Sequence, residues 1–168
     1  PVRMPDESII WVQSVSAPHR RDNGEIVWDG LNLDITERKM AEEKLYESEK
    51  RLREAVESLQ EGFVLFDAED RLVMVNDVYR RSYPMIQGIL EKGLRFEDLI
   101  RGIAESGYLV EAVGREEEFI RERVEQHRNP KGRIIRQTSD GKWRMIHEVR
   151  TLEGGTVLTV TDISCLKV

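Results

Sequence analysis

The chain has 168 residues, of which 39% are hydrophobic and 35% are charged, and its formal net charge is −6. This length and composition predict a folded protein with one complete core and some additional segments. The net negative charge without a long Lys or Arg block argues against nucleic-acid binding, and no apolar run approaches the roughly 18 residues that span a membrane. We therefore expect a cytoplasmic protein that neither binds nucleic acid nor inserts into a membrane.

The first predicted element is a β-hairpin made of two β-rich runs at residues 8–13 and 25–33. A connection rich in Pro, Asn and Gly joins the two runs. An isolated hairpin is marginally stable in water, so its apolar side chains should bury against something else. The chain begins at Pro1 without a methionine, and we expect it to be a piece of a longer protein.

A long helix is predicted over residues 34–60, where small and apolar residues recur every seven positions. Asp34 is placed to cap this helix, and Glu37, three residues later, would complete a capping box. The narrow seam on a charged helix is typical of a two-stranded coiled coil. An amphipathic helix packed on its own domain is the alternative. The seam residues are Ala41, Leu45, Ser48, Leu52, Ala55 and Leu59.

After this helix the sequence changes to two apolar strands, GFVLFD at residues 62–67 and RLVMV at residues 71–75, with a tight turn between them. Both strands are apolar on both faces, so each face of their sheet should be covered. Three short helices are predicted at residues 76–84, 95–107 and 114–130, and three strands at residues 133–138, 142–152 and 156–163. This order predicts an α+β domain with one five-stranded antiparallel sheet and its helices on one face.

An internal repeat explains the N-terminal hairpin. The segment WDGLNLDIT ends at Thr36 and the segment TVLTVTDIS ends at Ser164, and each follows a Trp-bearing strand and a Gly-containing turn. Asp34 therefore corresponds to Asp162. The repeat predicts a tandem array, in which residues 1–36 end one copy, residues 37–60 form a linker helix, residues 61–164 form a complete second copy, and residues 165–168 begin the next linker.

The order of these motifs resembles the PAS sensor family. The resemblance is carried by GFVLFD, by RLVMVN ending at Asn76, by DGKW ending at Trp143, and by the terminal DIS, and it covers nearly the whole chain. The chain is most similar to PAS modules of bacterial sensor histidine kinases, in which DIT is followed by a segment like ERKMAEEKL. Ser164 stands where the family usually has Thr, and Ser can make the same capping hydrogen bond.

The resemblance implies a non-catalytic sensory and dimerisation module whose parent protein is a sensor histidine kinase. Asp34, Thr36, Asp162 and Ser164 would couple the sheet to the helices that leave it. No cofactor or metal is predicted, but an unknown small ligand could occupy a void in the core. The residues expected to line that void are Tyr79, Tyr83, Met85 and Trp143.

Two histidines suggest other chemistry. His147 lies in HEVRT, which is similar to the phosphoacceptor box of histidine kinases, but the surrounding pattern is that of a strand and Leu152 stands in the place of the usual Pro. His127 ends the third short helix, where some PAS sensors carry a haem-ligating His, yet its charged neighbours favour a helix-end cation. Cys165, the single cysteine, is not on the helical segment that flavin photochemistry requires. We therefore expect a colourless protein.

Two alternative functions stay open, namely a ligand-free scaffold for oligomerisation and a PAS module of a cyclic-di-nucleotide signalling protein. An enzyme is a weaker hypothesis, because no nucleophile, base and orienting residue can be assembled from these motifs. The expected partners are a second copy of the chain, paired in parallel through the helical seam and the outer sheet surfaces, and the neighbouring PAS and output domains of the parent protein.

Overall fold

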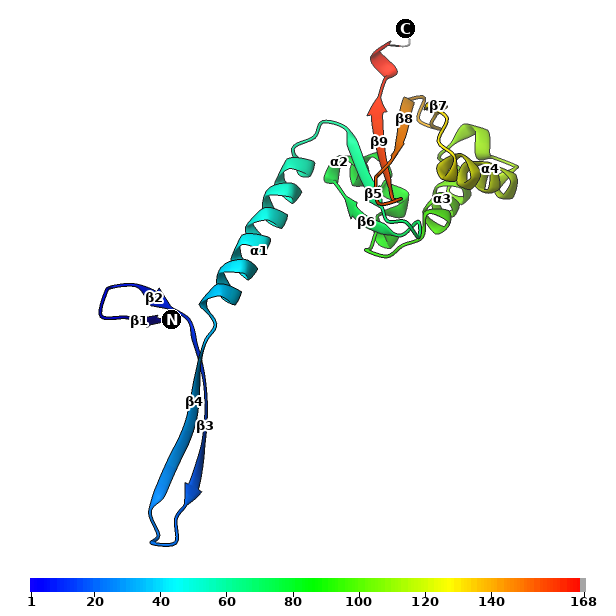
Figure 1. Cartoon of the computed structure of the whole chain (residues 1–168). Coiled ribbons are helices and arrows are strands. Elements are labelled where there is room, and N and C mark those ends of the chain that lie inside the picture. Colours follow the sequence, from blue (N-terminus) through cyan, green and yellow to red (C-terminus); the bar gives the residue numbers. More distant parts are fainter. Residues whose placement is uncertain (167–168) are drawn as a thin grey trace. The chain divides into compact units, whose positions relative to one another are not determined.

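The computed structural model describes residues 1–166 and forms two compact units, Pro1–Arg53 and a second unit that starts at Glu54 (Figure 1). Of the described helices, none combines the length and the apolar character that crossing a membrane requires. The last two residues of the predicted further linker, 167–168, lie outside the described residues. Each unit is built from a different part of the predicted tandem array.

The first unit is dominated by the hairpin of β3 (Val12–Arg20) and β4 (Ile26–Asp34), preceded by the short pair β1 (Val2–Arg3) and β2 (Ile9–Ile10). The antiparallel register places Val12 opposite Asp34 and Arg20 opposite Ile26. The first strand is thus longer than predicted, because it continues through Pro18. A two-stranded hairpin consists of edge strands only, where the missing N–H of a proline can face solvent.

Many apolar side chains of this unit are exposed. Those of the strands and the residue between β2 and β3 include Ile9, Trp11, Val15, Ile26, Trp28, Leu31 and Leu33. A two-stranded hairpin cannot bury both of its faces by itself. The sequence predicts that these side chains bury against another surface, and the hairpin itself does not provide one.

Helix α1 (Thr36–Glu57) is shorter at both ends than the predicted helix over residues 34–60. Its Leu45 and Leu52 side chains are 62% and 57% exposed, and Val56 is its buried residue. The last residue of the predicted seam, Leu59, lies beyond the helix and donates its N–H to the Val56 carbonyl. The helical part of the predicted seam therefore ends at Ala55, four residues before Leu59, and its leucines Leu45 and Leu52 are exposed.

The second unit contains the predicted five-stranded antiparallel sheet, with the strand order β6-β5-β9-β8-β7 (Figure 1). Its strands are β5 (Gly62–Phe66), β6 (Leu72–Val75), β7 (Arg133–Gln137), β8 (Trp143–Arg150) and β9 (Thr156–Asp162). The helices are α2 (Asp77–Ser82), α3 (Phe96–Glu105) and α4 (Glu116–Arg128), with short 3-10 turns at Pro84–Ile89, Val110–Ala112 and Ser164–Leu166. The predicted α+β fold is confirmed.

The core lies between the sheet and the helices. Alternation along β5 turns Val64 and Phe66 inward, and Leu158 on β9 and Leu99 on α3 are buried against them. Burying each such side chain stabilises the fold by about 1.5–3 kcal/mol relative to leaving it exposed. These contacts hold the helices on one face of the sheet, as predicted.

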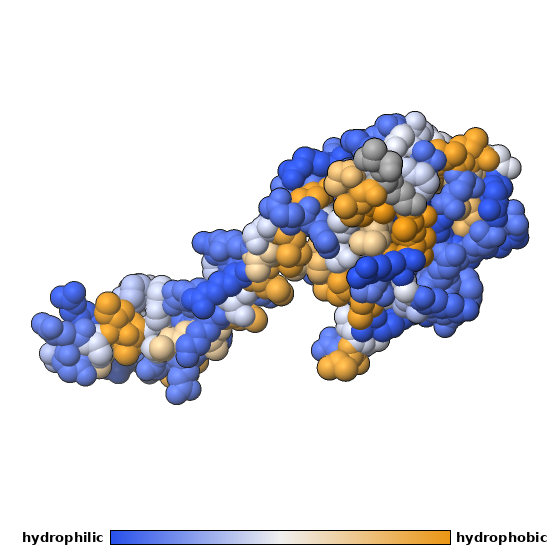
Figure 2. Space-filling model, turned by 90° about the horizontal axis from the view of Figure 1, so that it is seen from above, coloured by the Kyte–Doolittle hydropathy of each residue, from blue (hydrophilic) through white to orange (hydrophobic). Residues whose placement is uncertain are grey.

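The other face of the sheet is only partly covered. Phe63 and Leu65 of β5, Met74 of β6 and Met145 of β8 are half-buried, and Val149 is exposed. Figure 2 shows several hydrophobic patches on the surface of this unit between larger hydrophilic areas. We expected both faces of the apolar strands to be covered. Within this unit, only the face that packs against the helices is covered.

Candidate functional site

The C-terminal end of the sheet is held to the following residues by a compact hydrogen-bond cluster. Asp162 Oδ1 accepts from the Ser164 N–H at 3.0 Å and from the Ser164 hydroxyl at 2.6 Å. The Ser164 oxygen in turn accepts from the Trp143 N–H at 2.9 Å, and the Trp143 carbonyl accepts from the Ile163 N–H at 2.9 Å. We call this arrangement the latch. It binds the first residue of β8 to the chain that leaves β9.

The same latch occurs at the end of the N-terminal hairpin. Asp34 Oδ1 accepts from the Thr36 N–H at 2.9 Å and its hydroxyl at 2.6 Å, and Thr36 Oγ1 accepts from the Trp11 N–H. The Ile35 N–H donates to the Trp11 carbonyl at 2.8 Å, and the Ile35 carbonyl accepts from Lys39 as the first helical acceptor. The sequence predicted Asp34 as the cap of this helix, but α1 begins at Thr36, so Ile35 occupies the cap position and Asp34 lies one residue before it. The Asp34 carboxylate binds Thr36 instead.

Both latch carboxylates are held in the charged state. Hydrogen bonds from the Thr36 hydroxyl and N–H lower the pKa of Asp34, and those from Ser164 lower the pKa of Asp162. Asp162 also forms an ion pair with Arg144, whose Nη1 lies 3.4 Å from Oδ2. Arg144 is buried on the inner side of β8, so the C-terminal latch has a charged link into the domain that its sequence motif did not reveal.

Asn76 holds together the place where the incoming helix stops and β5 begins. This is the same end of the sheet as the latch, because Gly62 of β5 pairs with Val160 near the end of β9. Its fully buried side chain accepts from the N–H groups of Phe63 and Tyr79 at 2.8 and 3.0 Å. Its amide donates to the carbonyl groups of Val56 and Glu61 at 3.3 and 2.9 Å. The predicted Asn cap of α2 is confirmed, and the same side chain also binds the end of α1 and the start of β5.

The interior contains a small cavity instead of a large ligand pocket. Tyr79 and Tyr83 line it, and its volume of about 20 Å³ is the size of a single water site. Burial raises the pKa of Tyr83 to about 12. The other two predicted lining residues lie elsewhere: Met85 packs at the edge of the core, and Trp143 shares the outer face of β8 with Met145. Side-chain alternation along β8 accounts for the position of Trp143 outside the core.

A buried ionic cluster between α4 and β8 was not predicted. Arg123 donates to both carboxylate oxygens of Glu148, at 3.1 and 2.6 Å, and the His127 Nδ1–H donates to Glu148 Oε1 at 2.9 Å. The His127 ring stacks on Phe96 with centroids 3.6 Å apart. Its Nε2 has no hydrogen-bond partner among the described residues and lies 3.5 Å from an oxygen of Asp70.

Charge compensation keeps this cluster stable inside the protein. Burial alone raises the pKa of Glu148, but the hydrogen bond from His127 and the charge of Arg123 outweigh that effect and lower it to about 2. The sequence predicted His127 as a helix-end cation among charged neighbours, and it does lie in the last turn of α4, but its side chain is fully buried. Its spacing carried the signal, since Phe119, Arg123 and His127 follow at four-residue intervals and share one helix face.

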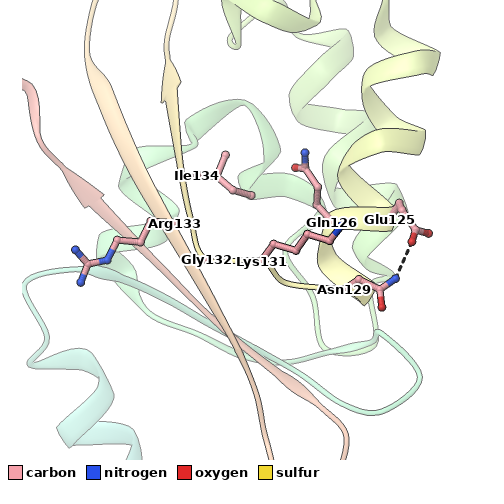
Figure 3. Close-up of a pocket in the computed structure, with 7 residues that line it drawn as sticks. All are labelled: Glu125, Gln126, Asn129, Lys131, Gly132, Arg133 and Ile134. Atoms are coloured by element: carbon pink, nitrogen blue, oxygen red, sulfur yellow. Dashed lines mark hydrogen bonds between the residues drawn. The ribbon is translucent and has the colours of Figure 1, made fainter.

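A second hollow lies on the surface between α4 and the loop that leads into β7. Figure 3 shows the side chains of Gln126, Lys131 and Asn129 near one another there, whereas Arg133 points away. The volume is about 320 Å³, and the Asn129 amide donates to Glu125 at 2.6 Å. These five side chains are exposed, and among the described residues no group of three His, Cys, Asp or Glu is arranged to hold a metal ion. We therefore assign no binding site to this hollow.

Comparison with known proteins identifies the family. Residues 56–167 match the family model described as the PAS fold. The non-motile and phage-resistance protein of Caulobacter vibrioides is 32% identical to this chain in an alignment of 165 residues, and the match covers 94% of the chain. The chain spans only 18% of that relative's length.

Two solved structures are similar to part of this chain. The PAS domain of an HTR-like protein from Haloarcula marismortui is 18% identical with a TM-score of 0.47, and the match covers 74% of this chain and 99% of that one. A domain of the sensory box sensor histidine kinase/response regulator from Geobacter sulfurreducens is 17% identical with a TM-score of 0.42, and covers 70% and 96%. The family assignment therefore rests on the family model and on the sequence relative.

Proposed function

This chain belongs to the PAS family of sensory signalling modules. We propose that it is a relay within a longer bacterial signalling protein, and that this parent protein is a histidine kinase. In this proposal a small ligand or a neighbouring domain alters the sheet, and the latch transmits the change to the helix that follows. The observation that carries the proposal is the occurrence of one latch at two places in the chain, each directly before a helical segment.

The latch is suited to transmission because it joins strand position to helix position. Trp143 is bonded through both its N–H and its carbonyl, so the start of β8 cannot shift without stretching bonds of 2.9 Å. Hydrogen bonds of this length weaken steeply when their distance or angle changes. Asp34 and Thr36 would act in the same way at the start of α1. The proposed coupling site therefore consists of Asp34, Thr36, Asp162 and Ser164.

On the incoming side, the end of α1 would pass its movement to the sheet through Asn76. The Glu57 carboxylate supports this connection, since it accepts from the Asp77 N–H at 2.9 Å. We further propose that two copies of the chain pair in the cytoplasm through parallel α1 helices. In this pair each Leu45 would face the Leu45 of the other copy, and each Leu52 would face the other Leu52. Two exposed leucines at heptad spacing on a charged helix favour this arrangement.

Substitution of Ser164 tests the relay in the complete protein that carries this chain. Ser164→Ala removes the hydroxyl that accepts from the Trp143 N–H, and we expect the output activity to change several-fold while Ser164→Thr preserves it. Ser139→Ala, at an exposed serine in the turn before β8, is the matched control. If amide exchange shows that the Trp143 bond is lost while signalling is that of the wild type, the latch is not the transmitting element.

Cysteine crosslinking tests the proposed pairing of α1 in a Cys165→Ser background. Leu45→Cys and Leu52→Cys should each give a disulfide-linked dimer under mild oxidation, because equivalent positions of a parallel seam face each other. Tyr46→Cys is the control, since Tyr46 is equally exposed but lies off the seam. A wild-type chain that sediments as a monomer at micromolar concentration would contradict the pairing.

A second candidate, a ligand-free scaffold, is favoured by the filled core. A cavity of about 20 Å³ cannot hold an organic ligand unless the surrounding side chains move. Native mass spectrometry separates the two candidates, because a sensor purified with its ligand carries extra mass and a scaffold does not. The output domain of the parent is a separate matter, and a cyclic-di-nucleotide enzyme is the alternative to a kinase there.

A further inference from the structure

The turn between β8 and β9 carries an exposed leucine that its backbone does not require. The Thr151 N–H donates to the Gly155 carbonyl and the Gly154 N–H donates to the Thr151 carbonyl, at 2.9 and 3.1 Å. Gly154 has φ +85°, a left-handed conformation that suits glycine. Leu152 projects from this turn and is completely exposed.

The equivalent turn of the N-terminal hairpin has the same geometry with a polar residue. The Arg21 N–H donates to the Glu25 carbonyl and the Gly24 N–H donates to the Arg21 carbonyl, both at 2.9 Å, and Gly24 also has φ +85°. Asp22 occupies the position of Leu152. Because the turn forms equally well with Asp, the leucine needs a reason outside local folding, and contact with another molecule would supply it.

Leu152 stands at the rim of a hollow between two turns. The hollow has a volume of about 600 Å³, and Leu65, Ala68 and Val73 supply apolar surface to it from β5, β6 and the turn between them. A Cβ on Gly155 would collide with the Phe66 carbonyl oxygen, so the two turns are in direct backbone contact. This contact makes the hollow a preformed feature of the fold.

The charged residues that line the hollow are all acidic. Asp67, Glu69 and Glu153 line it, and the described residues of its lining include no Lys, Arg or His. The Asp67 carboxylate is engaged by the N–H groups of its own turn, at 3.0 Å from Glu69 and 2.8 Å from Arg71. Glu69 and Glu153 form no ion pair within the described chain, so two carboxylates remain available to a cationic partner.

We propose that this hollow, which we call the two-turn groove, docks a segment of another protein that presents an aliphatic side chain between Lys or Arg residues. The apolar floor would take the aliphatic anchor, and the acidic rim would bind the flanking cations. The acidic rim would repel nucleic acid and anionic lipid, which excludes those partners. The inference does not depend on the latch or on the pairing of α1.

Peptide titration monitored by NMR tests the two-turn groove. The probe is a 14-residue helical peptide with two leucines four positions apart and lysines beside them, added to the ¹⁵N-labelled full chain. We expect saturable shifts of the amides of Ala68, Val73 and Leu152. A peptide with glutamates in place of the lysines should bind at least tenfold more weakly, because the groove carries like charge.

Leu152→Asp separates docking from general attraction between a cationic peptide and an acidic protein. The substitution adds negative charge but removes the apolar side chain of Leu152 from the groove. Asp is compatible with this turn geometry, as Asp22 shows. We expect it to weaken binding at least tenfold, whereas Val113→Asp, at an exposed valine away from the groove, should leave binding unchanged or slightly tighter.

Three results would overturn the proposal. The first is the absence of saturable shifts in the wild-type chain, and the second is Leu152→Asp binding as tightly as Val113→Asp. The third is a dimeric wild type that Leu152→Asp converts to a monomer, which would assign the groove to a second copy of this chain. A failure in the Ser164 or crosslinking experiments has no bearing on these outcomes.

Discussion

Replacing Glu148 with Gln should strongly destabilise the second unit. The substitution keeps the shape of the side chain but leaves the buried Arg123 guanidinium without its counter-charge. Removing one partner of a buried ion pair typically costs about 3–5 kcal/mol. The structure supports a similar figure, because the pKa of Glu148 falls from 4.5 to about 2 in the folded state, which corresponds to roughly 3 kcal/mol at about 1.4 kcal/mol per tenfold change.

The pH dependence provides an independent measure of the same interaction. Because folding lowers the pKa of Glu148, its contribution to stability is fully present above about pH 4.5 and is lost as the pH falls towards about 2. Gln has no proton to bind in this range. The difference in stability between wild type and Glu148→Gln should therefore be largest at neutral pH and should shrink as the pH falls from 4.5 to 2.

Urea unfolding followed by far-ultraviolet circular dichroism measures both quantities, and a loss of about 3 kcal/mol should lower the melting temperature by about 10 °C or more. Glu117→Gln is the control, since Glu117 pairs with Arg101 on the exposed surface of α4 and its loss should have no measurable effect. Replacing Arg123 with Met and Glu148 with Leu together should be less harmful than either single change. A loss below about 1 kcal/mol for Glu148→Gln, or an unchanged pH profile, would refute the reasoning.

Three further predictions concern other sites. Asn76→Ala removes four hydrogen bonds to buried backbone groups and should cost about 2–4 kcal/mol with faster amide exchange at the start of β5; unchanged exchange there would contradict the assigned role. Gly155→Ala should destabilise by about 1–3 kcal/mol because its Cβ has no space, whereas Gly88→Ala, which meets no atom within 4 Å, should be tolerated; equal melting temperatures would show that the turns can separate. The purified chain should show no haem or flavin absorbance, because the His127 ring is held by Glu148, and a visible band that survives gel filtration would disprove this.

Much of the architecture could be predicted because its signals are local. Apolar, β-rich runs separated by turns with Gly, Asp or Asn identified the five strands of the second unit in their order along the chain. The Asn cap at residue 76 and the Gly that follows α3 located helix ends for the same reason, since backbone conformation at a turn or cap depends on a few adjacent residues. The repeated DIT and DIS segments likewise identified Asp34 and Asp162 as equivalent positions, and each of these carboxylates forms the same pair of latch hydrogen bonds.

The predictions that differ from the structure concern contacts between distant residues. The sequence assigned Trp143 to an interior void, but the register of β8 in the sheet turns it to the outer face, and the packed tyrosines leave space for one water. The seam was extended to Leu59, although the chain leaves the helix after Glu57 to bring Asn76 against the Val56 carbonyl. In both cases a tertiary contact overrode a regular pattern.

The amino-acid sequence by itself determined the order of elements, the family and the Asp–Thr and Asp–Ser pairs of the latch, because these follow from residues close together in the chain. The latch bonds to Trp11 and Trp143 span 25 and 21 positions and are found only in the structure. The tertiary structure alone decided that Arg123, His127 and Glu148 form one buried cluster, since the bonded residues of α4 and β8 lie 21 to 25 positions apart in the chain. Burial of those charges is tolerable only when all of them come together. Whether a charged side chain lies in solvent or in the core is therefore decided by its partners in space.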